Sequence, residues 1–160
     1  MKVISSVLKK EEHENIENKF ISNNFPWFYS AHQSSTDNNS YLFHHFYSNN
    51  QITSNFYYLI LPIIEIIKPV SLINIRANLV INRNKVIKSA YHYDKFNNNA
   101  LDHQTLIYYV NTNNGYTEFE NKNKVNCIAN SMIIFKANNK HRGCSQTDSD
   151  YKSVININFK

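Results

Sequence analysis

The chain has 160 residues, of which 42% are hydrophobic and 14% aromatic; this composition is typical of a folded globular protein and excludes an intrinsically disordered one. A chain of this length is expected to form a single domain, residues 1–160, and can bury about two-thirds of its unfolded surface. The net charge of +5 points weakly to nucleic acid, because only three of the seventeen basic residues are Arg and no long basic run is present.

Cysteine usage and hydropathy exclude further classes of protein. Cys127 and Cys144 are too few for a disulfide scaffold and lack zinc-type spacing. The first fourteen residues contain no apolar stretch that is typical of a signal peptide. The most apolar stretch, residues 56–67, is too short to span a bilayer. We therefore expect a soluble cytoplasmic protein with reduced thiols and no membrane partner; the sequence predicts no oligomeric state.

Helical periodicity dominates the first 70 residues. Residues 8–23 place Ile16 and Phe20 four apart on one apolar face, which predicts an amphipathic surface helix. A loop rich in Ser, Asn and His is expected to follow. Residues 56–67 predict a second helix with a broad apolar face, which Thr53 or Ser54 can cap. Pro62 either kinks this helix or starts another.

From residue 71 onward the hydrophobic period becomes two, which is typical of β-strands. We expect strands at residues 71–81, 86–93, 104–111, 116–120, 125–128, 132–135 and 152–159. The sequence Asn113-Asn114-Gly115 predicts a hairpin between the third and fourth of these strands. The predicted fold class is mainly β with N-terminal helices (α+β): a β-barrel or jelly roll at residues 71–160, buttressed by helices at residues 1–70.

The chemistry is concentrated around Tyr91-His92-Tyr93-Asp94. His92 and Asp94 are two residues apart, so on a strand both side chains would point to the same face. His141, which follows the apolar strand at residues 132–135, is the most suitable third ligand. Two imidazoles and one carboxylate form the facial triad of non-haem Fe(II) oxygenases. A histidine at a strand end beside a solvated aspartate is the alternative interpretation of the pair alone.

Several segments of the chain, taken together and in order, match one known family. The chain resembles the prolyl-4-hydroxylase-like branch of the 2-oxoglutarate/Fe(II)-dependent oxygenases, in particular short stand-alone members encoded by tailed phages. The matching segments cover about residues 71–160 and are Ile75-Arg76-Ala77-Asn78-Leu79, Tyr91-His92-Tyr93-Asp94, Thr105-Leu106-Ile107-Tyr108-Tyr109-Val110-Asn111, Asn114-Gly115-Tyr116-Thr117-Glu118-Phe119, His141-Arg142-Gly143 and Lys152-Ser153-Val154-Ile155-Asn156-Ile157-Asn158-Phe159.

The resemblance implies a double-stranded β-helix with a metal site at the barrel mouth. His92, Asp94 and His141 would be the catalytic iron ligands. Lys152, assisted by the hydroxyl of Tyr109, would bind the distal carboxylate of 2-oxoglutarate. The cofactors would be Fe(II), 2-oxoglutarate and O2, with ascorbate as a reductant. The reaction would be hydroxylation of a C–H bond, with a protein or peptide as the substrate, in the host cytoplasm if a phage encodes the chain.

The sequence departs from this family at two positions. Lys152 stands where many relatives have Arg. Leu79 stands where many have a Tyr beside the cosubstrate, so neither the contribution of Leu79 to 2-oxoglutarate binding nor that of Arg76 is predicted. Two other functions stay open: a 2-oxoglutarate oxygenase acting on nucleobases, with nucleic acid as its partner, and a non-catalytic β-barrel binding module.

Other polar residues have less specific interpretations. Residues 95–102 and the adjoining His103 form either a loop that closes over the substrate or a plain connection between strands. Arg76 would line the pocket or form an ion pair, and Arg83 and Arg142 would contact an acidic substrate or face solvent. We interpret His32, His44 and His45 as surface residues or satisfied polar residues.

Overall fold

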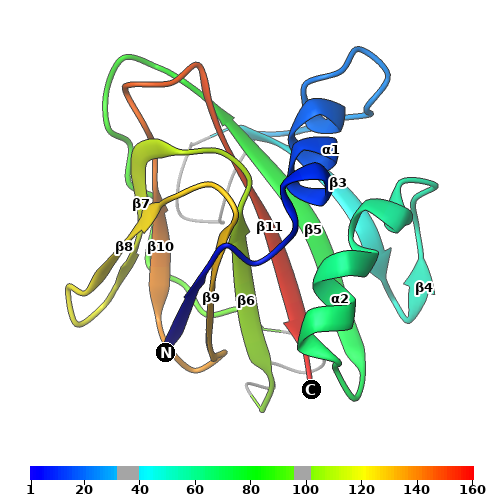
Figure 1. Cartoon of the computed structure of the whole chain (residues 1–160). Coiled ribbons are helices and arrows are strands. Elements are labelled where there is room, and N and C mark those ends of the chain that lie inside the picture. Colours follow the sequence, from blue (N-terminus) through cyan, green and yellow to red (C-terminus); the bar gives the residue numbers. More distant parts are fainter. Residues whose placement is uncertain (32–39, 96–101) are drawn as a thin grey trace.

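Two β-sheets pack against each other in the computed structural model, which describes residues 1–31, 40–95 and 102–160 (Figure 1). The larger sheet has the strand order β1-β9-β6-β11-β5-β3-β2, with β4 paired to β3, and the smaller sheet has the order β10-β7-β8. The strands are β1 (Lys2–Ser5), β2 (Phe28–Ser30), β3 (Tyr41–Ser48), β4 (Gln51–Ile52), β5 (Leu72–Ile81), β6 (Gln104–Tyr109), β7 (Asn113–Phe119), β8 (Lys124–Cys127), β9 (Ser131–Lys136), β10 (His141–Cys144) and β11 (Tyr151–Phe159).

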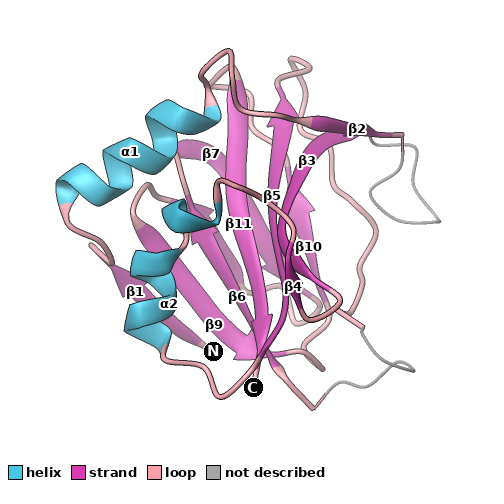
Figure 2. Ribbon diagram, turned by 90° about the vertical axis from the view of Figure 1, so that its right-hand side faces the viewer, coloured by secondary structure: helices cyan, strands magenta, loops and turns pink. Residues whose placement is uncertain are grey.

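The helices cover the face of the larger sheet that is turned away from the smaller one (Figure 2). They are α1 (Lys10–Phe20) and α2 (Leu61–Ile67), and the 3-10 helix η1 (Tyr57–Leu59) precedes α2. Strand β6 shows how the pleat divides the core. Leu106 and Tyr108 belong to the cluster under the helices, whereas Ile107 and Tyr109 belong to the cluster between the sheets. The larger sheet therefore has two buried faces, one under the helices and one toward the smaller sheet.

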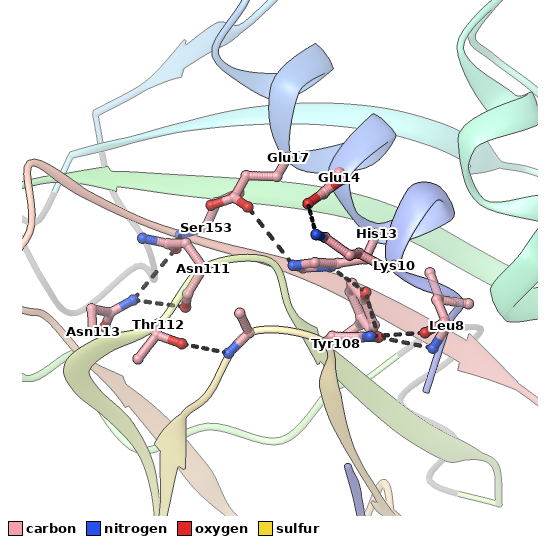
Figure 3. A network of polar contacts seen from close by, with 12 residues as sticks. Leu8, Lys10, His13, Glu14, Glu17, Tyr108, Asn111, Thr112, Asn113 and Ser153 are labelled. Carbon is pink, nitrogen blue, oxygen red and sulfur yellow. Dashed lines mark hydrogen bonds and ion pairs between the residues drawn. The ribbon is translucent and has the colours of Figure 1, made fainter. Parts of the chain in front are cut away.

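A polar network attaches α1 to the larger sheet (Figure 3). His13 Nδ1 lies 2.7 Å from the hydroxyl of Tyr108, which donates to Asn130 Oδ1 at 3.1 Å. Asn130 in turn bonds both the backbone N–H and the carbonyl of Leu8, at 2.8 and 2.9 Å. These bonds satisfy polar groups that α1 would otherwise bury unpaired.

The predicted fold class, mainly β with N-terminal helices, is confirmed. Six of the seven predicted strands coincide with β5, β6, β7, β8, β9 and β11 to within a few residues. The first helix is also confirmed, with Ile16 and Phe20 each 1% exposed. Pro62 starts a new helix, since it lies in the first turn of α2. No helix in the described ranges is both long and apolar enough to cross a membrane.

The predicted hairpin at Asn113-Asn114-Gly115 is wrong. These residues lie inside β7, which pairs with β8 and β10, whereas β6 pairs with β9 and β11. The chain therefore crosses from one sheet to the other at this point. The polar groups that suggested a turn have other partners: Asn113 Oδ1 accepts the N–H of Gly115 at 3.0 Å, and the side chain of Asn114 bonds Thr147.

Two further predictions are corrected. Residues 86–93 form no continuous strand, but run beside β10 with single bridges at Lys88–Cys144 and His92–His141. Between these bridges three residues on one side oppose two on the other, so one extra residue interrupts the ladder, as in a β-bulge. The expected Ser-, Asn- and His-rich loop contains the eight-residue strand β3. Most of the predicted loop at residues 95–102 and His32 lie outside the described residues.

Candidate metal centre

The structure brings His92, Asp94 and His141 together. One ligand atom from each lies within 4.8 Å of the others, and His92 Nε2 is 3.7 Å from Asp94 Oδ1. Two backbone hydrogen bonds between His92 and His141, of 2.9 and 3.0 Å, fix the two segments side by side. Although the segment after β5 is not a regular strand, it places His92 and Asp94 beside His141, the first residue of β10.

Backbone carbonyls orient both imidazoles. Nδ1 of His92 lies 3.1 Å from the carbonyl of Ala90, and Nδ1 of His141 lies 3.1 Å from the carbonyl of Asn139. A carbonyl only accepts, so each Nδ1 must carry the proton and each Nε2 keeps its lone pair. Burial lowers the pKa of His141, although Asp94 opposes this shift. The resulting neutral ring is the form that binds a metal.

The carboxylate of Asp94 is held through one oxygen only. Oδ2 accepts hydrogen bonds from Thr105 Oγ1 at 2.9 Å and from Asn158 Nδ2 at 3.2 Å. Burial alone would raise the pKa of Asp94, but His141, His92 and these two hydrogen bonds outweigh it and hold the pKa below its usual range. The group is therefore ionised at neutral pH, and Oδ1 faces the histidines.

Thr105 and Asn158 were missed by the sequence reasoning as functional residues. Asn158 could have been found, because it falls on the polar face of the alternating β11. Thr105 is the second residue of β6 and carries no such signal. Two oriented imidazoles and one ionised, oriented carboxylate oxygen form the donor set that suits Fe(II). These three residues thus fit the metal that the sequence implies.

A cavity of about 150 Å³ adjoins this cluster between the two sheets. Lys152, 7% exposed, lies in its wall. Its ammonium donates to the carbonyl of Cys144 at 2.7 Å and to that of Tyr116 at 3.2 Å. Among the described residues no carboxylate pairs with it. A buried cation without a counter-ion is costly, so this end of the cavity suits an anionic ligand.

Gly115 makes room for the lysine. A Cβ at this position would lie 2.7 Å from Asn113 Oδ1, 2.9 Å from the carbonyl oxygen of Cys144 and 3.1 Å from Lys152 Cδ. The first two distances are too short for carbon, and one of them involves backbone. Glycine is therefore required here by close packing behind Lys152, and not by a turn as the Asn-Gly sequence suggested.

Tyr109 does not itself line the cavity. Its buried hydroxyl donates to Thr117 Oγ1 at 2.9 Å, and Thr117 is the cavity-lining residue. Burial raises the pKa of Tyr109, so the phenol stays protonated and keeps donating. The proton of Thr117 is then available to a different acceptor. The sequence analysis predicted Tyr109 and missed Thr117, the hydroxyl-bearing residue that lines the cavity.

The other predicted polar residues have varied surroundings. Arg76 lines the cavity. Arg83 also lines it and bonds the carbonyl of Ser40 at 3.0 Å. Arg142 pairs with Glu118, with Nε 2.7 Å from Oε2. Leu79 is buried and is absent from the cavity wall, to which its neighbours Asn78 and Val80 contribute.

The other described histidines are not part of the group of metal ligands. His44 is a satisfied buried residue, as predicted, with Nδ1 and Nε2 each 2.7 Å from a partner, the carbonyl of Pro26 and the hydroxyl of Ser54. His103 is 4% exposed, so it is not a surface residue. Among the described residues, no further histidine joins the cluster of His92, Asp94 and His141.

Known proteins match this chain in their three-dimensional structure but not in sequence searches. No family model matches the sequence, and no curated protein matches it. A viral collagen prolyl hydroxylase from Paramecium bursaria Chlorella virus-1, in complex with 2-oxoglutarate, has a TM-score of 0.64 at 14% identity, covering 98% of this chain and 93% of its own. A Trichoplax adhaerens prolyl hydroxylase bound to a peptide of hypoxia-inducible factor has a TM-score of 0.69 at 12% identity, covering 99% and 82%.

A third similar structure has a different activity. The non-haem, α-ketoglutarate-dependent epimerase of nogalamycin biosynthesis has a TM-score of 0.70 at 12% identity, covering 99% of this chain and 76% of its own. At these identities the likeness concerns the fold. The chain has the double-stranded β-helix fold of the 2-oxoglutarate/Fe(II) oxygenases.

Proposed function

We propose that the protein is an Fe(II)- and 2-oxoglutarate-dependent dioxygenase that hydroxylates a C–H bond. The observation that carries the proposal is the position of the oriented His92–Asp94–His141 cluster at a cavity that also holds an uncompensated buried lysine. A metal site alone fits many proteins. A metal site and a buried cation in one small cavity fit a ligand that has a chelating end and an anionic end.

Each residue has a defined role in this proposal. His92, Asp94 and His141 hold Fe(II). Lys152 binds the distal carboxylate of 2-oxoglutarate, where a paired cation and further hydrogen bonds offset the cost of burying the anion. Thr117 donates its hydroxyl proton to the same carboxylate, and Tyr109 holds Thr117 in place. Tyr109 thus acts through another residue and not by direct contact.

The bound cofactors supply oxidative decarboxylation of 2-oxoglutarate by O2, which yields succinate and CO2 and the oxidising power for hydroxylation. The protein contributes geometry and a dry site. Val80, Ile87, Ile107 and Val154 line the cavity with apolar surface and exclude water from the reacting groups. The hydrogen bonds from Thr105 and Asn158 keep Asp94 ionised and oriented while the metal is held.

A prolyl or other peptidyl side chain is the substrate that we propose. Support comes from two similar structures, a viral collagen prolyl hydroxylase and a prolyl hydroxylase with a bound peptide. The epimerase of the same fold shows that the fold does not dictate the outcome of the reaction. The reaction type therefore has to be measured and is not given by the architecture.

The test is succinate formation by the purified protein with Fe(II), 2-oxoglutarate and O2, with and without ascorbate, while proline-containing peptides and DNA oligonucleotides are offered as substrates. Asp94→Ala is the matched inactive control. We expect metal-dependent succinate release that a peptide accelerates, with a mass increase of about 16 Da in that peptide, the mass of one oxygen atom. No release above the Asp94→Ala background under any condition would refute the proposed activity, and acceleration by DNA alone would refute the peptide substrate.

A further inference from the structure

The cavity carries more positive charge than the proposed cofactors use. Among the residues that the structure describes, the charged wall residues are three cations, Arg76, Arg83 and Lys152, and one carboxylate, Asp94. A divalent metal adds two positive charges and 2-oxoglutarate adds two negative ones. Two positive charges remain when both cofactors are counted with neutral imidazoles. Such an excess of positive charge around one cavity favours a further anion.

Arg76 is a wall cation that has no ionic partner among the described residues. Its Nε is buried and makes no hydrogen bond, and Oδ1 of its neighbour Asn78 is in the same condition. Within the described part of the chain, no acidic residue forms an ion pair with Arg76; its guanidinium lies 5.7 Å from the ring centre of Tyr41. Buried donors on charged groups are rarely left unpaired, because the loss is larger than for neutral groups.

Strand register places Arg76 near the metal ligands and far from Lys152. Arg76 pairs with Asn156 on β11, which is two residues from Asn158, the partner of Asp94, and four residues from Lys152. At about 3.3 Å per residue, the backbone of Arg76 is about 13 Å along the sheet from that of Lys152. A single five-carbon dicarboxylate anchored at Lys152 leaves Arg76 for another molecule.

Three other basic residues of this region already have partners. Arg83 donates to Ser40, Arg142 pairs with Glu118, and Lys140 pairs with Glu120 at 3.0 Å. A nucleic-acid backbone would need a row of unengaged cations. One guanidinium beside the metal centre, without an ionic partner among the described residues, matches one carboxylate, which it can bind through two parallel hydrogen bonds.

We propose that Arg76 binds a carboxylate of the primary substrate and selects acidic substrates. This inference rests on the proposed function and names the substrate class of the same site. The carboxylate belongs either to an acidic side chain in a peptide or to a free amino acid. Arg76 is then a specificity-determining residue of the substrate subsite, and the cosubstrate depends on Lys152.

The test compares acid and amide members of two probe pairs: acetyl-Glu-Pro-amide with acetyl-Gln-Pro-amide, and L-glutamate with L-glutamine. Succinate formation is measured for the parent, Arg76→Gln, Arg76→Lys and Arg83→Gln; the last removes the same charge from the same cavity. In the parent the acid member of one pair should have the lower KM, and the pair that shows this identifies peptide or free amino acid. Arg76→Gln should raise that KM about 10- to 100-fold, the loss expected for a hydrogen bond to a charged group, whereas Arg76→Lys should keep part of the preference and Arg83→Gln most of it.

Other outcomes overturn the inference while leaving the proposed activity measurable. The rate of 2-oxoglutarate turnover without substrate, and its KM for 2-oxoglutarate, report on the metal centre and Lys152. If Arg76→Gln raised the KM for 2-oxoglutarate, Arg76 would bind the cosubstrate. Equal KM values for acid and amide in both pairs, or Arg76-dependent acceleration by a DNA oligonucleotide, would equally overturn the assignment. Absence of any metal-dependent turnover in the parent would instead refute the proposed function.

Discussion

Replacing Lys152 by Met should leave the stability of the cosubstrate-free protein unchanged or raise it, and should strongly weaken the binding of 2-oxoglutarate. The lysine is 7% exposed and its ammonium has two backbone carbonyls as partners and no described carboxylate. Without 2-oxoglutarate it is an uncompensated buried charge, so an apolar side chain of similar length should be neutral or stabilising by up to a few kcal/mol. With 2-oxoglutarate, the variant leaves the buried carboxylate unpaired, which costs about 3–5 kcal/mol, or a few-hundred-fold or more in affinity.

Thermal or urea unfolding in oxygen-free buffer with Mn(II) measures both effects. At 2-oxoglutarate concentrations of about 100 times the parent Kd, the parent should gain about 2.7 kcal/mol. For the variant this concentration is a few-fold below its own Kd, so the variant should gain less than about 0.4 kcal/mol. Lys136→Met, an exposed substitution on β9, is the matched control and should behave as the parent. A variant that gained as much as the parent would show that the carboxylate is bound elsewhere, with Arg76 the first candidate.

Three further predictions follow from the residues around the site. Thr105→Val removes one of two hydrogen bonds to Asp94 Oδ2 and should weaken metal binding about 10- to 100-fold in a Mn(II) titration; unchanged affinity would exclude a supporting role. Gly115→Ala should reduce both stability and 2-oxoglutarate affinity, because the new Cβ meets backbone at 2.9 Å; a variant equal to the parent in urea unfolding and cosubstrate titration would show that the strand yields freely. Burial lowers the pKa of His44, although its hydrogen bond to the carbonyl of Pro26 opposes this shift. The neutral ring of His44 therefore contributes fully to stability above about pH 6.5, the unfolded-state pKa, and this contribution is lost as the pH falls to the lower folded-state pKa. Urea unfolding between pH 7.5 and 5 should show a steeper loss for the parent than for His44→Gln, and equal slopes would contradict this.

The sequence predicted the elements whose side chains alternate cleanly. Strand β11 shows apolar Ile155 and Ile157 on one face and Lys152, Asn156 and Asn158 on the other, and the structure confirms this division between core and cavity. Apolar periodicity likewise predicted α1. These patterns are local, so a single sequence is enough to reveal them.

Elements that depend on distant partners could not be predicted. Strand β3 looked like a polar loop because His44 hides its alternation, and only Pro26 and Ser54 make that histidine acceptable in the interior. The Asn-Gly sequence at Gly115 looked like a turn because the crowding behind Lys152 comes from another strand. Tertiary contacts overrode local preference in both cases.

The candidate site divides in the same way. The residue types and their order predicted His92, Asp94 and His141 as a ligand set, and their ligand atoms lie within 4.8 Å of one another. The groups that orient this set, Thr105 and two backbone carbonyls, come from segments without a motif. Groups that hydrogen-bond the metal ligands are positioned by the fold, so they can be identified only from the three-dimensional structure.

Metal binding tests the central claim most directly. Equilibrium dialysis against Fe(II) in oxygen-free buffer, followed by metal analysis, should find one Fe(II) per parent chain. His92→Ala, Asp94→Ala and His141→Ala should each lose most of it, while His45→Ala, which removes an imidazole outside the cluster, should retain it. Three single variants that bind iron as the parent does would contradict the assignment of this cluster as the metal centre.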